Sequence, residues 1–255
     1  IRVSPKVSQQ KSLSSLQNAL RLLKLFSIEK PEFGVFEVAE ALGIANSTAH
    51  RLLSTLAEQD FVTKDHNTNM YRLSVSILAM QPVITSQIEL FHQAGPVLQS
   101  LTDKTKETSL LSILHENRAY CLNKADCQLP TFTYTTHIGK AHPLYQSAAG
   151  HVLLAYQTDD QIQEYIDRYL AVKDHSIQAA LLQSLHHVKQ HGFTVTVNQL
   201  YPGITSIAAP VKNQTDQVVA AIEIVGPNQR LEKGQREKMV TLMKKAADKL
   251  SKRLV

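Results

Sequence analysis

The chain has 255 residues, of which 43% are hydrophobic and 19% charged, and its formal net charge at pH 7 is +5. This composition is that of an average soluble protein, and the length suits one large domain or two ordinary ones. No stretch approaches the roughly 20 unbroken apolar residues of a membrane helix, and the first residues lack a secretion-signal pattern. We therefore expect a cytoplasmic protein with no membrane association.

The basic surplus is unevenly distributed along the chain. Residues 229–255 carry nine Lys or Arg against three Asp or Glu, whereas residues 1–73 carry nine against seven. A basic tail helix is usually a solvated surface, so net charge alone does not indicate nucleic-acid binding. Cys121 and Cys127 match neither a disulfide framework nor a metal pattern, and His187 and His191 lack a nearby third metal ligand. No metal and no cofactor is expected.

The first 74 residues predict a small domain of three helices followed by two strands. Residues 1–12 are polar and are expected to form a disordered tail, and residues 13–74 the domain itself. Apolar residues recur at helical spacing and then give way to two short strand patterns around a polar turn. The expected helices span about 14–26, 35–42 and 47–58, the last with Asn46 as its N-cap, and the strands span 61–65 and 70–73.

The rest of the chain predicts a linker helix and a second, larger domain. Residues 75–92 are assigned to the linker and residues 93–255 to the domain. The expected helices span about 96–106, 147–155, 159–169 and 178–191 and start again at 233, and the strands span 108–114, 119–124, 194–198, 205–211 and 217–225. Their irregular alternation predicts an α+β fold with a mainly antiparallel sheet flanked by helices.

The second and third predicted helices have the small residues of a helix-turn-helix. Counting Val35 as position one, Ala39, Gly43 and Ala49 fall at positions five, nine and fifteen, where the helices touch, turn and share a core. The outer face of the third helix carries short hydroxyl groups and an arginine, which suit major-groove contacts. The predicted DNA-binding residues are Ser47, Thr48, His50, Arg51, Ser54 and Thr55 on this helix and Lys64, Asn67 and Arg72 in the wing. The alternative is an ordinary three-helix core with a polar surface.

The motifs of both regions resemble one family. SLQNALRLLKLF, VAEALGIANSTAHRLLSTL and YRL in the first region resemble the DNA-binding domain of IclR-family bacterial regulators. HPLYQSAAGHVLLAY, GFTVTVNQLYPGITSIAAPV and VVAAIEIVGP resemble three motifs of the same family's second domain, in the same order. The resemblance implies a winged helix-turn-helix, a GAF-like effector domain, and assembly as a homodimer or a dimer of dimers. Asp60 and Ser74 depart from it, because the family usually has Gly at both turn positions.

The second domain carries the residues expected to hold a small effector. Residues 147–150 open a helix with small side chains, and such a helix start suits an anionic or carbonyl group. In the last strand, Glu223 alternates in register with Val219, Ala221 and Val225, opposite a wholly apolar face. The predicted effector-binding residues are Gly139, Ala148, Ala149, Gly150, His151, Thr196, Ile204, Ser206, Glu223 and Val225.

Glu223 also bears on the chemistry of the effector. Relatives commonly have Ser at this position, and several of them sense small carboxylates, which an inward-facing carboxylate would repel. The buried carboxylate needs a partner. The partner is either a protein group such as His151 or His142, or the effector itself, which would then be hydroxylated or cationic. The alternative places Glu223 in solvent at a sheet face.

These patterns predict a transcription regulator that is not an enzyme. It is expected to bind double-stranded DNA at a palindromic operator as a symmetric oligomer, under the control of a small-molecule effector. No G-x-S-x-G, P-loop or G-x-G-x-x-G motif is present. The alternative is a small-molecule-binding protein or enzyme whose winged helix serves protein contacts only.

Overall fold

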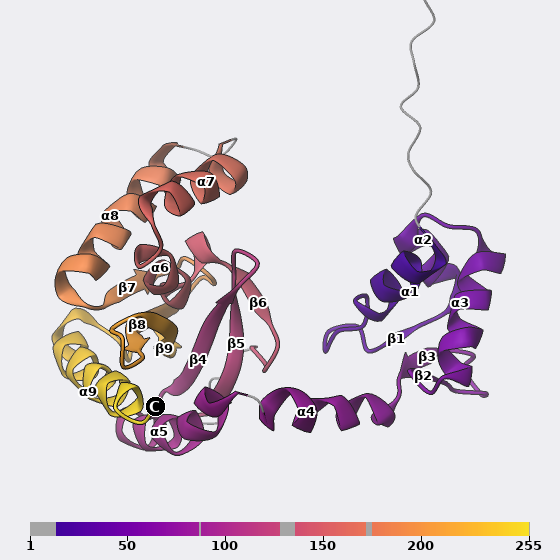
Figure 1. Cartoon of the computed structure of the whole chain (residues 1–255), viewed down its shortest axis with the longest axis horizontal. Coiled ribbons are helices and arrows are strands. Elements are labelled where there is room, and N and C mark those ends of the chain that lie inside the picture. The colour runs from indigo at the N-terminus through magenta and orange to yellow at the C-terminus, as the bar shows by residue number, and fades with distance from the viewer. Residues whose placement is uncertain (1–13, 87, 128–135, 172–174, 255) are drawn as a thin grey trace, which may run out of the picture. The chain divides into compact units, whose positions relative to one another are not determined.

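The computed structural model describes residues 14–86, 88–127, 136–171 and 175–254. The chain divides into two compact units, residues 1–87 and 88–255 (Figure 1). The tail expected over residues 1–12 lies outside the described residues. No helix in the described ranges is long and apolar enough to span a membrane.

The N-terminal unit is a winged helix-turn-helix. Its sheet has the order β1-β3-β2 with antiparallel pairing, and residues such as Leu22, Val38, Leu53 and Tyr71 fill a common core. The elements are α1 Ser15–Leu23, β1 Glu32–Phe33, α2 Val35–Leu42, α3 Asn46–Glu58, β2 Val62–Lys64 and β3 Tyr71–Leu73. The first helix is shorter than predicted, and the two-residue strand β1 was not predicted because it is too short to show a pattern.

Two details of the turns were tested by the structure. Gly43 ends α2 with φ of 68°, the left-handed conformation that the helix-turn-helix spacing predicted. The predicted N-cap of α3 was wrong by one residue, since Ala45 occupies that position and Asn46 begins the helix. This difference of one residue does not move the outer face of α3.

The two family departures lie next to each other. Asp60 has φ of 58°, so it adopts the conformation for which glycine is the usual choice. The Ser74 hydroxyl donates to the Asp60 carboxylate at 2.9 Å, and Ser74 also caps the helical turn that follows it. The two replacements therefore support each other, and the turn keeps its shape without the glycines.

The expected linker helix is interrupted. A 3₁₀ helix, η1 Val75–Ala79, leads into α4 Met80–Ser86, and a separate helix, α5 Glu89–Thr105, begins seven residues before the predicted start at position 96. Pro96 lies inside α5. The predicted helix start at position 96 was therefore too late in the chain.

The C-terminal unit contains a six-stranded antiparallel sheet with the order β6-β5-β4-β9-β8-β7. The α+β prediction is confirmed, although β6 and the 3₁₀ helix after it were not predicted. The strands are β4 Thr108–His115, β5 Arg118–Ala125, β6 Ala141–Pro143, β7 Thr194–Val197, β8 Ile204–Lys212 and β9 Val218–Pro227. The remaining helices are η2 Leu144–Gln146, α6 Ala148–Ala155, α7 Asp159–Leu170, α8 His175–His191 and α9 Lys233–Ser251.

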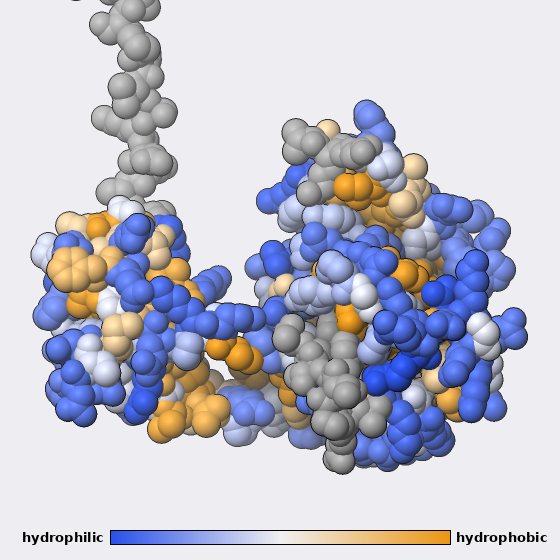
Figure 2. All heavy atoms as spheres, turned by 180° about the vertical axis from the view of Figure 1, so that it is seen from behind, coloured by the Kyte–Doolittle hydropathy of each residue, from blue (hydrophilic) through white to orange (hydrophobic). Residues whose placement is uncertain are grey.

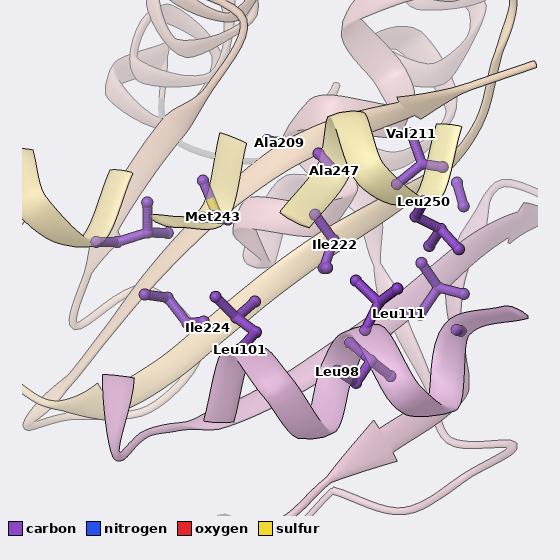
Figure 3. Close-up of a cluster of buried hydrophobic side chains, with 14 of the residues drawn as sticks. Leu98, Leu101, Leu111, Ala209, Val211, Ile222, Ile224, Met243, Ala247 and Leu250 are labelled. Carbon is purple, nitrogen blue, oxygen red and sulfur yellow. The ribbon is translucent and has the colours of Figure 1, made fainter. Parts of the chain in front are cut away.

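Helices cover both faces of this sheet. On one face, α5 and α9 pack against Leu111, Ile222, Ile224 and neighbouring apolar side chains, as Figure 3 shows. On the other face, α6 packs against β8 and β9, and Ala208 and Ala221 join a second cluster with α6, α7 and α8. Glu223 lies between Ile222 and Ile224 in β9, so the alternation of the strand turns it toward the α6 side.

Candidate DNA interface and effector site

The third helix presents the polar face that the sequence predicted. Ala49 and Leu53 are fully buried against the other helices, and Leu52 is nearly so. Ser47, His50, Arg51 and Thr55 are exposed, whereas Thr48 and Ser54 are half-buried on the flanks of the face. Exposed hydroxyl and guanidinium groups on one helix face can reach base edges and phosphates in a major groove.

The wing adds further donors beside this helix. A groove of about 470 Å³ lies between α3 and the β2 region, with His50, Ser54 and Lys64 among its lining residues. Asn67 and Arg72 are exposed, and Lys64 is half-buried with its ammonium 5.7 Å from the centre of the Tyr71 ring. The wing turn is ordered by Asp65, whose carboxylate accepts the Asn67 N–H at 2.8 Å, and these backbone contacts lower its pKa.

The start of α6 is tightly built against the segment before it. The Ser147 hydroxyl accepts the Gly150 N–H at 3.0 Å and caps the helix. A Cβ on Gly150 would lie 2.3 Å from the Leu144 backbone oxygen, so only glycine fits this contact. Ala148, Ala149 and Gly150 are buried, as expected for a helix start that faces the sheet.

Glu223 is buried against this helix start and does not lie in solvent. Only 3% of its surface is exposed. Burial raises the pKa of its carboxyl group to about 7, while hydrogen bonds from the Ser206 hydroxyl and the Ala149 backbone N–H act in the opposite direction. Its Oε1 has no hydrogen-bond partner among the described residues. Oε1 is therefore a buried acceptor that the described residues leave without a donor.

The expected histidine partners do not reach Glu223. The His151 Nδ1 lies 2.7 Å from the Ser184 hydroxyl of α8, and its Nε2 lies 3.0 Å from the Tyr145 carbonyl oxygen of η2. Burial lowers the pKa of His151, so the ring is neutral at pH 7. His142 belongs to β6, which is separated from β9 by β5 and β4. Ser206 and Ala149 take the role that the sequence had assigned to a histidine.

Apolar side chains border Glu223 on the same side of the sheet. Val225 is fully buried and packs with Leu110 and Cys121, with Ile204, Leu200 and Tyr201 partly buried around them. Burial raises the pKa of the Cys121 thiol to about 12, so it stays protonated. The sequence had treated Cys121 only as a reduced thiol, and its alternation in β5 was the signal that could have placed it here.

The other predicted effector residues lie at different distances from this cluster along the sheet. Thr196 pairs in register with Ser206 across β7 and β8. Gly139, with φ of 87°, donates its N–H to the Cys121 carbonyl oxygen at 2.8 Å. Thr196 and His151 also line a groove of about 1030 Å³ between α8, β7 and the first turns of α9. The structure therefore brings Ala149, Ser206 and Glu223 together and turns the His151 ring away.

A winged helix-turn-helix followed by a separate α+β domain is an arrangement found in DNA-binding regulators. Residues 15–66 match the IclR helix-turn-helix domain, and residues 83–252 match the C-terminal domain of bacterial transcriptional regulator IclR. The chain belongs to the IclR family. It is a transcriptional regulator with an N-terminal DNA-binding domain and a C-terminal effector-binding domain.

Individual relatives are similar along nearly the whole chain. The HTH-type transcriptional regulator KdgR of Escherichia coli is 26% identical over 95% of this chain and 93% of its own length. The glycerol operon regulatory protein of Streptomyces coelicolor is 27% identical over 87% of each chain. An IclR homologue from Microbacterium hydrocarbonoxydans, solved with 4-hydroxybenzoate, has a similar fold, with a TM-score of 0.81 at 19% identity over 94% of this chain and 99% of that one.

Proposed function

We propose that this regulator reads a two-fold operator through α3 and the wing, and that its α6–β9 site responds to a small hydroxylated or cationic metabolite. The observation that carries the operator half is the exposed face of α3, which holds Arg51 among short hydroxyl side chains opposite a buried apolar stripe. Such a face can combine one bidentate base contact with several weaker contacts.

Arg51 gives the test of this proposal. If its guanidinium reads a base, Arg51→Ala should weaken operator binding by roughly 1–3 kcal/mol and random DNA much less. Arg21→Ala is the matched control, because Arg21 is an exposed arginine outside the predicted surface. Fluorescence anisotropy with labelled duplexes at two salt concentrations measures both affinities. Equal losses on operator and random DNA would assign Arg51 to a phosphate, and no sequence preference in the unmodified protein would refute the operator proposal.

The segment formed by η1 and α4, called here the connecting segment, is apolar, and the partner proposed for it is a second copy of the chain. Val75, Leu78, Val83 and Ile84 are each more than half exposed, and Met80 is 48% exposed. Figure 2 shows hydrophobic surface on this segment. Clustered apolar side chains of this kind mark interaction sites on soluble proteins. A two-fold pairing through it would place two copies of α3 on a palindromic operator, in a homodimer or a dimer of dimers.

The α6–β9 site is proposed to bind its effector without transforming it. The site combines a helix start, a buried carboxyl group and an apolar wall made by Val225, Leu110 and Cys121. A few polar groups set into an apolar lining are typical of small-molecule sites. The relatives described above carry the names of regulators, which favours a sensing role over catalysis.

A further inference from the structure

The N-terminus of α6 is already occupied by a carboxyl group of the protein itself. Helix starts attract anions because their first N–H groups have no partner within the helix and the helix dipole is positive there. Here the side chain of Glu223, which is 3% exposed and comes from the middle of β9, lies beside the Ala149 N–H. The Ser206 hydroxyl on β8 lies beside the same carboxyl group.

One oxygen of this carboxyl group remains without a partner. Glu223 Oε1 is buried and accepts no hydrogen bond from any described residue. A buried acceptor without a donor destabilises the folded protein, and more so when the acceptor is charged. A ligand that supplies a donor would remove this destabilisation.

We propose that Glu223 is the built-in occupant of the anion site at the start of α6, and that the effector therefore binds with a hydrogen-bond donor or a cation, not with a carboxylate. This inference rests on the proposed effector role of the α6–β9 site. A ligand carboxylate would bring a second negative charge into a site that excludes water, where like charges repel strongly. A hydroxyl, amide or ammonium group would instead pair with Oε1.

The side chains named around Glu223 are neutral or paired with another group, so Glu223 supplies the charge of the site. Cys121 on β5 is a protonated thiol and His151 on α6 is neutral at pH 7, each because of its burial. Lys124, also on β5, pairs with Asp126 at 2.8 Å and donates to the Thr136 carbonyl oxygen at 2.8 Å. Leu110 on β4 and Ser206 on β8 carry no charge. Acidification below pH 7 should therefore discharge Glu223 and weaken the exclusion of carboxylates.

Two substitutions separate the space that Glu223 fills from the charge that it carries. Glu223→Ser shortens the side chain and opens the helix start, whereas Glu223→Gln keeps the site filled but removes the charge. Glu164→Ser serves as the control, because it makes the same substitution at an exposed glutamate of α7 and leaves Glu223 in place. Circular dichroism and thermal unfolding of each full-length variant establish that it is folded.

Calorimetry at pH 8 with acetate and 4-hydroxybenzoate, and with acetamide and 4-hydroxybenzamide as neutral counterparts, tests the proposal without DNA. We expect folded Glu223→Ser to bind at least one carboxylate tenfold or more tightly than the unmodified protein, without the same gain for its amide. Glu223→Gln should gain less, and Glu164→Ser should gain nothing. Carboxylate binding by the unmodified protein should strengthen from pH 8 to pH 6, and that of Glu223→Ser should not.

Three results would overturn this inference without affecting the operator proposal. They are carboxylate binding by the unmodified protein as tight as by Glu223→Ser, an equal gain in Glu223→Gln and Glu223→Ser, or no gain in a folded Glu223→Ser. Failure of the full-length protein to prefer any operator would instead count against the proposed function, whatever the calorimetry shows.

Discussion

Glu223→Gln should remove a loss of stability that the unmodified protein suffers as the pH rises. The folded-state pKa of Glu223 is about 7, whereas the ordinary value is 4.5. The folded state therefore binds more protons than the unfolded state between these two values, and stability falls as pH rises through them. The loss begins near pH 4.5 and is complete above about pH 7.

The size of this loss follows from the two pKa values. A shift of one pKa unit corresponds to about 1.4 kcal/mol, so burying the ionised carboxyl group costs on the order of 3 kcal/mol in the limit. Between pH 5 and pH 8 the unmodified protein should lose roughly 2–3 kcal/mol relative to Glu223→Gln, because most of the titration lies in this interval. The glutamine has the same shape and no charge to desolvate.

Urea unfolding at pH 5 and pH 8 measures the effect as a double difference. The buried His151 and the half-buried His142 have lowered pKa values and give the opposite slope, but both are present in the two proteins, so their effects cancel. Seven of the eight tyrosines lie in residues 88–255 and the chain has no tryptophan, so tyrosine fluorescence follows the effector-binding unit. Parallel pH dependence of the two proteins would show that Glu223 is hydrated, and would refute the buried carboxyl group.

Three further predictions follow from single contacts. The Glu107 carboxylate is 2% exposed and accepts two hydrogen bonds of 2.7 Å from Arg230. Arg230→Leu leaves this buried charge without its partner, at a cost of about 3–5 kcal/mol. Glu107→Leu should therefore destabilise the protein less than Arg230→Leu. Gly150→Ala forces a Cβ against the Leu144 backbone and should lower the melting temperature by several degrees, as calorimetry would show, for a cost of about 1–3 kcal/mol. Val83→Asp should shift sedimentation toward the monomer and weaken operator binding, and an unchanged oligomer would reject the connecting segment as the interface.

The elements predicted from the sequence are those with a clear period or a strong punctuating residue. Gly43 predicted the end of α2 to the residue, and the alternation of β9 predicted which side chains meet α5 and α9. The strands that were missed, β1 and β6, are held by pairing with β3 and β5, and each is too short to carry a period. The start of α5 was misplaced because Pro96 is tolerated within the helix.

The effector site shows why partners are harder to predict than positions. Strand alternation placed Glu223 inward, but it said nothing of what the carboxyl group would meet there. The nearest titratable candidates in the motif, His151 and His142, were natural choices by charge, yet Ser184 and Tyr145 hold His151 on the α8 side. The groups that reach Glu223 are a hydroxyl from β8 and a backbone N–H from α6.

A backbone donor has no sequence signature of its own, and this limits how far the motif could be interpreted. The small residues of 147–150 indicated an open helix start, which suggested an empty anion site waiting for a ligand. Glu223 lies 74 positions further along the chain, and only the register of β8 with β9 brings it beside Ser206 and within reach of Ala149. The open helix start and the inward Glu223 carboxylate therefore have a different meaning when they are combined. A helix start that suits anions is a filled site when an inward carboxylate lies on it. The group that remains available to a ligand is then a hydrogen-bond acceptor, Glu223 Oε1.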